Sequence, residues 1–211
     1  MSDASRYPIP ARMHRVEETI QRSRFITQLA HAPDADAAHA FVSTVRDALP
    51  DATHHCWAFV AGPPGSTLSV GMSDDGEPHG TAGRPMLTGL LHGGVGEIVA
   101  VCARYYGGVK LGTGGLTRAY GGGVKLALAS LPTEERVDRV DVSVTVRYPD
   151  VDAVHRLLDA LDVVLHGEEY GANVCLECGV PAQDVHTFRE AVADATRGSA
   201  RVELAGPDAA L

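Results

Sequence analysis

Hydrophobic positions along the chain follow two different periods, and together they predict an α+β fold. Short runs that alternate or are rich in β-branched residues predict strands, whereas apolar residues three and four positions apart predict helices. The predicted strands cover residues 23–31, 54–61, 67–72, 98–103, 137–148, 163–170, 172–180 and 200–204. The predicted helices cover residues 34–49, 83–92, 115–131, 151–161 and 181–196. The polar residues 1–22 predict an irregular lead into the first strand.

A change of pattern at residues 132–135 predicts a boundary between two domains. A proline and a charge run occur there, and the sequence after them is acidic. We therefore expect one domain at residues 1–133 and a second at residues 134–211. The second has a strand–helix–strand–strand–helix–strand order, which is typical of a ferredoxin-like domain.

Residues 94–125 combine a buried strand with a glycine-rich turn. The apolar run at residues 98–103 is continuous and rich in β-branched side chains, which favours a strand buried on both faces. The residues Arg-Tyr-Tyr follow at 104–106, and Gly-Thr-Gly-Gly at 112–115 opens a helical period. Because free N–H groups converge at the start of a helix, this geometry accepts anions.

Three sequence blocks resemble the signature of the IMPACT/YigZ family. They are HHC at residues 54–56, SDDGEPHGTAGRPML at residues 73–87 and GVGEIVAVCARYYGGVKLGTGGLTRAYGGGV at residues 94–124. The resemblance implies a first domain similar to domain IV of elongation factor G and to the second domain of a small-subunit ribosomal protein. It implies a second, ferredoxin-like domain similar to domain V of that factor, and a link to translation and RNA.

Charge is distributed unevenly along the chain. Residues 1–133 hold 11 basic and 11 acidic residues and are neutral, whereas residues 134–211 hold 7 basic and 16 acidic residues and carry the whole net charge of −9. No acidic residue occurs at positions 98–133, where four basic residues do. An anionic partner would therefore meet the first domain, and a protein that coats nucleic acid with its whole surface is unexpected.

The composition is that of a water-soluble protein with reduced thiols. Hydrophobic residues make up 45% and charged residues 21%, and no apolar run approaches the roughly 20 residues needed to cross a bilayer. The N-terminal sequence has no apolar signal region, so we expect a cytoplasmic protein, without membrane association, that is a monomer or a weak dimer. The cysteines are few, and three lie in strand-like runs, which favours reduced core thiols.

Basic side chains, glycines and two tyrosine rings occur together in residues 84–118, and they suggest a surface that binds phosphates and unstacked bases. The predicted ligand- or RNA-binding residues are Arg84, Arg104, Tyr105, Tyr106, Lys110, Gly112, Thr113, Gly114, Gly115 and Arg118. The alternative is that one tyrosine fills the core and that Lys110 is merely solvated.

The loop containing Asp74, Asp75, Gly76 and Glu77 places three carboxylates within four residues. Such a loop suits a hard cation or a general base. It equally suits a turn anchored by hydrogen bonds, or an ion pair with Arg84 or Arg104 that holds the glycine turn.

Motifs for other chemistry are weak or missing. His54 and His55 alternate faces on a strand, and Cys175 and Cys178 face opposite sides of another, so a zinc site is unexpected. The GTGG turn lacks the Lys-Ser/Thr pair of a P-loop and does not form GxGxxG, and no GxSxG is present. We expect no cofactor and no metal, and the sequence names no catalytic residue.

Three hypotheses about function remain. In the first, the protein contacts RNA or the ribosome through the basic, glycine-rich face of the first domain. In the second, it is an enzyme for a phosphorylated small molecule or nucleotide, with a carboxylate of residues 73–81 as base or Mg²⁺ ligand. In the third, the acidic second domain docks a protein partner.

Overall fold

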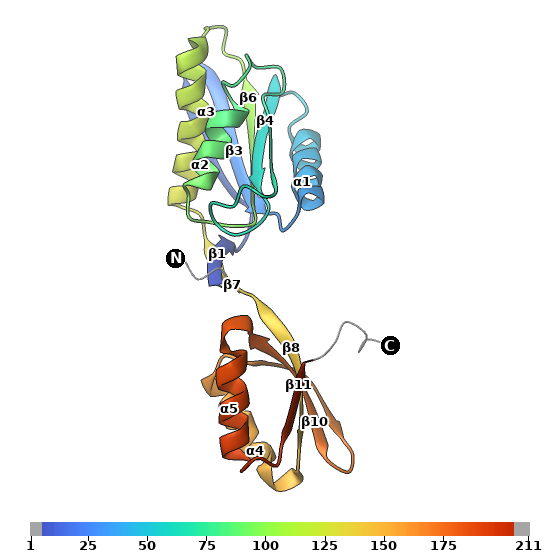
Figure 1. The fold of residues 1–211 in the computed structure, drawn as a ribbon. Coiled ribbons are helices and arrows are strands. Elements are labelled where there is room, and N and C mark those ends of the chain that lie inside the picture. The colour runs from blue at the N-terminus through green and yellow to red at the C-terminus, as the bar shows by residue number, and fades with distance from the viewer. Residues whose placement is uncertain (1–5, 205–211) are drawn as a thin grey trace. The chain divides into compact units, whose positions relative to one another are not determined.

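The computed structural model describes residues 6–204 of the chain, so residues 1–5 and 205–211 of the predicted domains lie outside the described part. The chain divides into two compact units (Figure 1). The first unit contains Tyr7–Arg136, and the second contains Arg6 and residues 137–204 of the described part. Both units combine helices and strands, which confirms the mixed α/β class and the two-domain layout.

A five-stranded antiparallel sheet forms the centre of the first unit, in the order β2-β3-β6-β4-β5. The strands are β2 (His14–Ile20), β3 (Ser23–His31), β6 (Ile98–Tyr105), β4 (His54–Val60) and β5 (Val70–Ser73). β6 is buried at every position from Ile98 to Arg104, as its continuous apolar run predicts. The predicted strand at residues 67–72 is shorter than expected and begins at Val70.

Helices cover both faces of this sheet (Figure 1). α1 (Ala35–Ala48) packs on the face that carries Phe59 and Val101, whereas α2 (Gly83–Leu91) and α3 (Gly112–Ala129) pack on the other. The Asp34 side chain accepts a 2.7 Å hydrogen bond from the Ala37 amide and so caps α1 at its N-terminus.

The three consecutive glycines of α3 do not break the helix. Gly123 lies so close to β3 that a Cβ atom would stand 2.5 Å from the Thr27 hydroxyl oxygen. A Cβ on Gly121 would be 3.5 Å from Pro85 of α2. The glycines therefore let α3 approach both the sheet and its neighbouring helix closely, which offsets their low helix propensity.

The prediction of an irregular segment at residues 1–22 is wrong for the described part. β1 (Arg6–Pro10) pairs with β7 (Thr133–Val137), and β2 forms an edge of the five-stranded sheet. β2 was missed because most of its residues are polar, and β1 was missed because it is short and contains Pro8 and Pro10. β7 also occupies the stretch where the composition changes, so residues 133–137 form a strand there.

Glu97 joins β1 and β7 to the rest of the first unit. Its side chain, 7% exposed, accepts a hydrogen bond from the Tyr7 hydroxyl at 2.8 Å and pairs with His31 and Arg136 at 2.7 and 2.5 Å. Burial alone raises the pKa of Glu97, but the hydrogen bonds from His31 and Tyr7 and the Arg136 charge outweigh it and lower the pKa.

The second unit is a four-stranded antiparallel sheet, in the order β11-β8-β10-β9, with two helices. Its elements are β8 (Arg139–Val146), α4 (Val151–Ala160), β9 (Val164–Tyr170), β10 (Val174–Pro181), α5 (Val185–Ala195) and β11 (Arg201–Leu204). Both helices contribute to one core around Val144, Leu176 and Phe188. The predicted strand at residues 137–148 is divided, because its first residue belongs to β7.

None of the helices in residues 6–204 has both the length and the apolar composition that a membrane crossing requires.

Candidate functional site

The carboxylate loop and the start of α3 meet at one cleft in the first unit. The cleft has a volume of about 530 Å³. Its lining residues are Thr53, His54, Glu77, Pro78, Arg104, Tyr106, Lys110, Leu111, Gly112, Thr113 and Leu116. Two motifs that are more than twenty residues apart in the sequence are thus brought together.

A buried ion pair forms one wall of the cleft. The Arg104 guanidinium donates to Glu77 Oε1 at 2.6 Å, and the two side chains are only 6% and 4% exposed. The Tyr120 hydroxyl donates to the same oxygen at 2.7 Å, and burial raises the pKa of Tyr120. Of the alternatives for the loop, the ion pair with Arg104 is therefore present, and hydrogen bonds help to offset its desolvation.

Arg104 does not project from the surface as a free cation. Its guanidinium also donates to the Ser23 hydroxyl at 3.3 Å and lies 5.4 and 5.5 Å from the ring centres of Phe25 and Tyr106. Its Nε is the one buried side-chain donor or acceptor in the described part of the chain that has no hydrogen-bond partner. Arg104 therefore lines the cleft as a buried side chain that is already paired with Glu77.

Asp74 anchors the carboxylate loop to the start of α2. Its carboxylate accepts hydrogen bonds from the amides of Gly80, Ala82 and Gly83 at 2.7, 3.0 and 2.9 Å. Burial alone raises the pKa of Asp74, but the bonds from these amides outweigh it and hold the pKa below its usual value. Asp74 thus caps α2 from outside the helix.

Asp75 ties the same loop to β4 and α1. Its carboxylate accepts from the His55 amide and from Arg46, both at 2.6 Å, and its carbonyl bonds to His54 Nδ1 at 2.7 Å. Both aspartates therefore act as loop anchors, the second of the alternatives drawn from the sequence. No cluster of three or more His, Cys, Asp or Glu side chains that could hold a metal ion occurs within residues 6–204.

α3 begins at Gly112, three residues earlier than predicted, so the Gly-Thr-Gly-Gly sequence is its first turn. Gly112 has a φ of +70°, a backbone conformation that glycine adopts readily. The helix has no side-chain cap, and its first turn contains no acidic residue. The amides of this turn have no acceptors within the helix.

The two tyrosines of the motif lie in different surroundings. Tyr106 is 48% exposed and lines the cleft. Tyr105 is half-buried, and the Arg24 guanidinium lies 4.7 Å from its ring centre. Neither ring fills the core, and only Tyr106 is placed to contact a ligand in the cleft.

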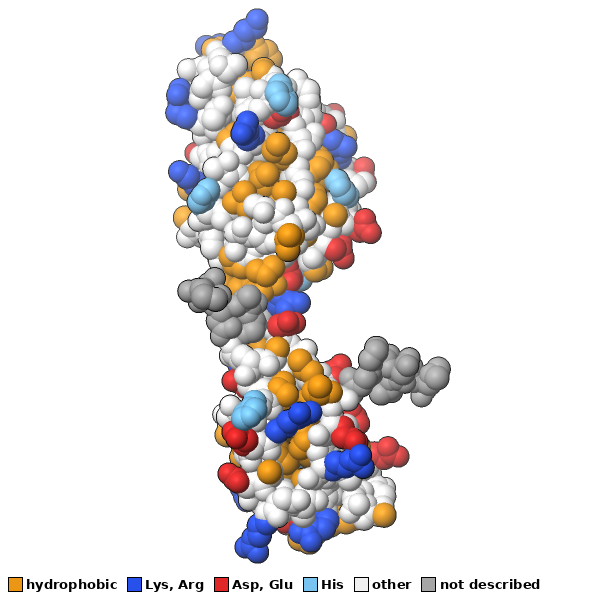
Figure 2. All heavy atoms as spheres, viewed as in Figure 1, with side chains coloured by type: hydrophobic (Ala, Val, Ile, Leu, Met, Phe, Trp, Pro, Cys, Tyr) orange, Lys and Arg blue, Asp and Glu red, His pale blue; other side chains and the backbone are white. Residues whose placement is uncertain are grey.

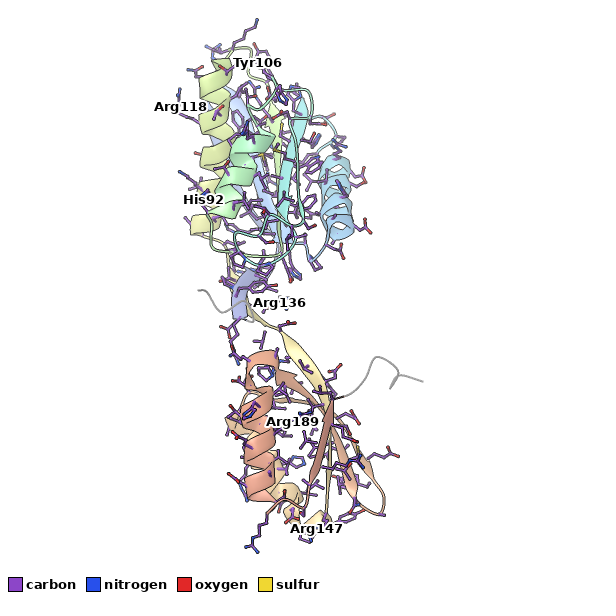
Figure 3. All side chains as sticks on the ribbon, viewed as in Figure 1. His92, Tyr106, Arg118, Arg136, Arg147 and Arg189 are labelled. Atoms are coloured by element: carbon purple, nitrogen blue, oxygen red, sulfur yellow. The ribbon has the colours of Figure 1, made fainter. Side chains whose placement is uncertain are left out.

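A second concavity, which we call the α2–α3 groove, lies between those helices and has a volume of about 900 Å³. Its lining includes the basic residues Arg84, Arg118 and Lys125, the side chain of His92, and the glycines Gly80, Gly89, Gly93, Gly121 and Gly122. Neither helix contains an acidic residue. Figure 3 shows Arg118 on α3 and His92 just after α2 on the same side of the first unit.

The predicted site residues are thus divided between two hollows. Arg84 and Arg118 line the α2–α3 groove, whereas Arg104, Tyr106, Lys110, Gly112 and Thr113 line the cleft. Tyr105, Gly114 and Gly115 are not among the lining residues of either. Arg84 of α2 was predicted, but the groove beside it was not, although Gly89 of α2 and Gly93 just after that helix are four positions apart and allow α3 to approach closely.

Comparisons with known proteins identify the family. The family model for the Impact N-terminal domain matches residues 21–128, and the model for a domain of unknown function, DUF1949, matches residues 144–199. IMPACT family member YigZ of Escherichia coli is 48% identical over 191 residues, which cover 90% of this chain and 94% of that protein. An IMPACT family member of Haemophilus influenzae is 40% identical over 198 residues, with 94% and 96% covered.

A solved structure described as a hypothetical protein is 45% identical and aligns with a TM-score of 0.68, covering 97% of this chain and 99% of its own. Two family models in order and relatives of nearly equal length agree with the motifs described above. The chain belongs to the IMPACT family.

Proposed function

We propose that this protein binds RNA through the α2–α3 groove and that it acts in translation. The observation that carries the proposal is the lining of the groove by Arg84, Arg118 and Lys125 on helices without a single carboxylate. All three side chains are exposed, and none has an ion pair or hydrogen bond with another described residue. They are therefore available to phosphates.

The glycines of the groove favour a strand-like polyanion over a compact anion. A Cβ on Gly122 would meet nothing within 4 Å, so the backbone surface there is open. A nucleic-acid backbone can lie close to such a surface while cations on both helices contact successive phosphates. Figure 2 shows Lys and Arg side chains along α3.

The fold supports a role in translation. The second unit has the βαββαβ order and the strand order β11-β8-β10-β9 that a ferredoxin-like domain requires. We infer that the second unit is similar to domain V of elongation factor G and the first to its domain IV. Both likenesses are implied by the family, and they support the proposal of a partner among RNA or ribosome-associated components in the cytoplasm.

Salt-dependent binding of a single-stranded RNA to the full chain tests the proposal. Replacing both Arg118 and Lys125 by Ala should weaken binding at least tenfold. Because log K for single strands changes with log salt by about −0.7 per neutralised phosphate, the slope should also fall by about 1.4.

The matched control removes two exposed arginines from the second unit, Arg147→Ala/Arg201→Ala, with the same change in net charge. The control should bind RNA like the original protein. Equal binding by the two double variants would overturn the groove as the RNA site.

An enzyme for a phosphorylated small molecule is a second candidate, and the cleft favours it. Of the three carboxylates of the loop, Glu77 is the one that lines the cleft. Nucleotide- and Mg²⁺-dependent thermal stabilisation, lost in Glu77→Gln, is the expected result for such an enzyme. A flat response across nucleotides and divalent cations would discard it.

A further inference from the structure

We infer that the cleft at the start of α3 binds a nucleoside 5′-monophosphate group, with the phosphate on the first-turn amides of α3 and the base on Tyr106. This site lies at the end of α3, whereas the α2–α3 groove runs along both helices. The inference therefore does not require the groove to bind RNA, and it names a ligand class for the cleft that the second candidate function also uses.

The phosphate end of the site is the uncapped N-terminus of an 18-residue helix. The first amides of a helix have no internal acceptors, and the helix dipole adds about half a positive charge there. No acidic residue occupies the first turn, and Lys110 stands exposed at the rim of the cleft. A phosphate is the ligand that this combination attracts most strongly.

A second, independent observation is that a buried nitrogen of Arg104 has no hydrogen-bond partner among the described residues. Arg104 is 5% exposed and lines the same cleft, and the unpaired nitrogen is its Nε. Buried donors in folded proteins are almost always paired, so an unpaired one calls for an acceptor. Arg104 already gives one N–H to Glu77 and one to Ser23, and a ligand oxygen or its bound water would complete the guanidinium.

The remaining lining of the cleft suits a base and a sugar. One side of the Tyr106 ring faces the Arg104 guanidinium, and the ring is 48% exposed, so a planar base can stack on the other side. Pro78, Leu111 and Leu116 add apolar contacts. A volume of about 530 Å³ lies within the range of pockets that hold small organic ligands.

The charges of the cleft select a monophosphate. Glu77 is neutralised by Arg104, so Lys110 and the helix terminus supply the positive charge. Three phosphates would need more cations, or Mg²⁺ held by free carboxylates, and Asp74 and Asp75 are occupied by backbone amides. The same group occurs in free nucleotides and at the 5′-phosphorylated end of RNA, and the test distinguishes these two sources.

The test is calorimetric titration of the full chain with the four nucleoside 5′-monophosphates, inorganic phosphate and the matching nucleosides. We expect saturable binding of at least one nucleotide, weaker binding of phosphate and no binding of the nucleosides. Tyr106→Ala should weaken nucleotide binding while leaving phosphate binding unchanged. The absence of saturable binding by every nucleotide at millimolar concentration would overturn the inference.

Thr113→Asp separates loss of the site from loss of the fold. A carboxylate in the first turn stabilises a helix, so the melting temperature should hold or rise while nucleotide affinity falls at least tenfold. The control is Thr187→Asp, which places the same charge in the exposed first turn of α5 and should leave binding unchanged. Nucleotide binding that survives Thr113→Asp would contradict the site.

Two short RNAs of one sequence, with a 5′-phosphate or a 5′-hydroxyl, identify the source. If the phosphorylated RNA binds more tightly and Thr113→Asp removes the difference, the site holds an RNA end. If only free nucleotides depend on Thr113, it holds a small molecule. If Arg118→Ala/Lys125→Ala loses RNA binding but retains nucleotide binding, the cleft binds nucleotides independently of the groove.

Discussion

At the scale of single residues, the three carboxylates of the acidic loop have structural partners. Asp74 and Asp75 bind backbone amides, and Glu77 binds a buried guanidinium. The sequence allowed these roles but could not select them, because the partners of Glu77 lie 27 and 43 positions away along the chain. Only the packing of β6 and α3 brings them to the loop.

Asp74→Ala should lower the free energy of unfolding by about 2 kcal/mol, since buried amides would lose their acceptor. The native pKa of Asp74 is lowered, so its contribution is present above the unfolded pKa of about 3.9 and is lost as pH falls through the native value. The difference from the original protein should thus be constant near neutrality and shrink below about pH 4. Urea unfolding across this range measures it, and a difference that grows in acid would contradict the assignment.

Glu77 and Arg104 should be strongly coupled. Glu77→Gln and Arg104→Met each leave a buried group without its partner and should cost about 3 kcal/mol. The double variant should cost less than the sum, because it leaves no uncompensated charge. Additive losses in a double-mutant cycle would mean that the two side chains act independently.

At the scale of elements, the sequence predicted those with a strong period and missed those without one. β3 and α1 were predicted closely because β3 alternates moderately between polar and apolar residues and α1 has an N-cap aspartate and a regular apolar face. β2 was missed because most of its residues are polar, and β1 was missed because it is short and contains two prolines. α3 starts early because Gly112 adopts a left-handed conformation that no periodicity reports.

Two neighbouring glycines of α3 should respond to the same change in opposite directions. A Cβ on Gly122 meets nothing, so Gly122→Ala should stabilise the protein by about 0.5–1 kcal/mol through helix propensity. A Cβ on Gly123 would collide with Thr27, so Gly123→Ala should destabilise by about 1–3 kcal/mol. Thermal unfolding of the two variants measures this, and equal effects would show that α3 does not approach β3 so closely.

At the scale of the whole molecule, the two units differ in net charge and therefore in how they interact with polyanions. Residues 134–211 carry the net charge of −9 and repel polyanions, whereas residues 1–133 are neutral and place Arg84, Arg118 and Lys125, three cations without an ion pair to any described residue, on α2 and α3. The basic segment was visible in the sequence. The groove was not, because it exists only where two helices separated by a strand pack side by side through their glycines.

The most direct measurement is photocrosslinking of the full chain to a single-stranded RNA containing 4-thiouridine, with the attachment sites mapped by mass spectrometry. If the groove is the binding surface, the crosslinks fall within residues 84–93 and 117–129, the two helical segments that form it. They should disappear at high salt and in Arg118→Ala/Lys125→Ala. Crosslinks confined to the second unit, or none at low salt, would contradict the account.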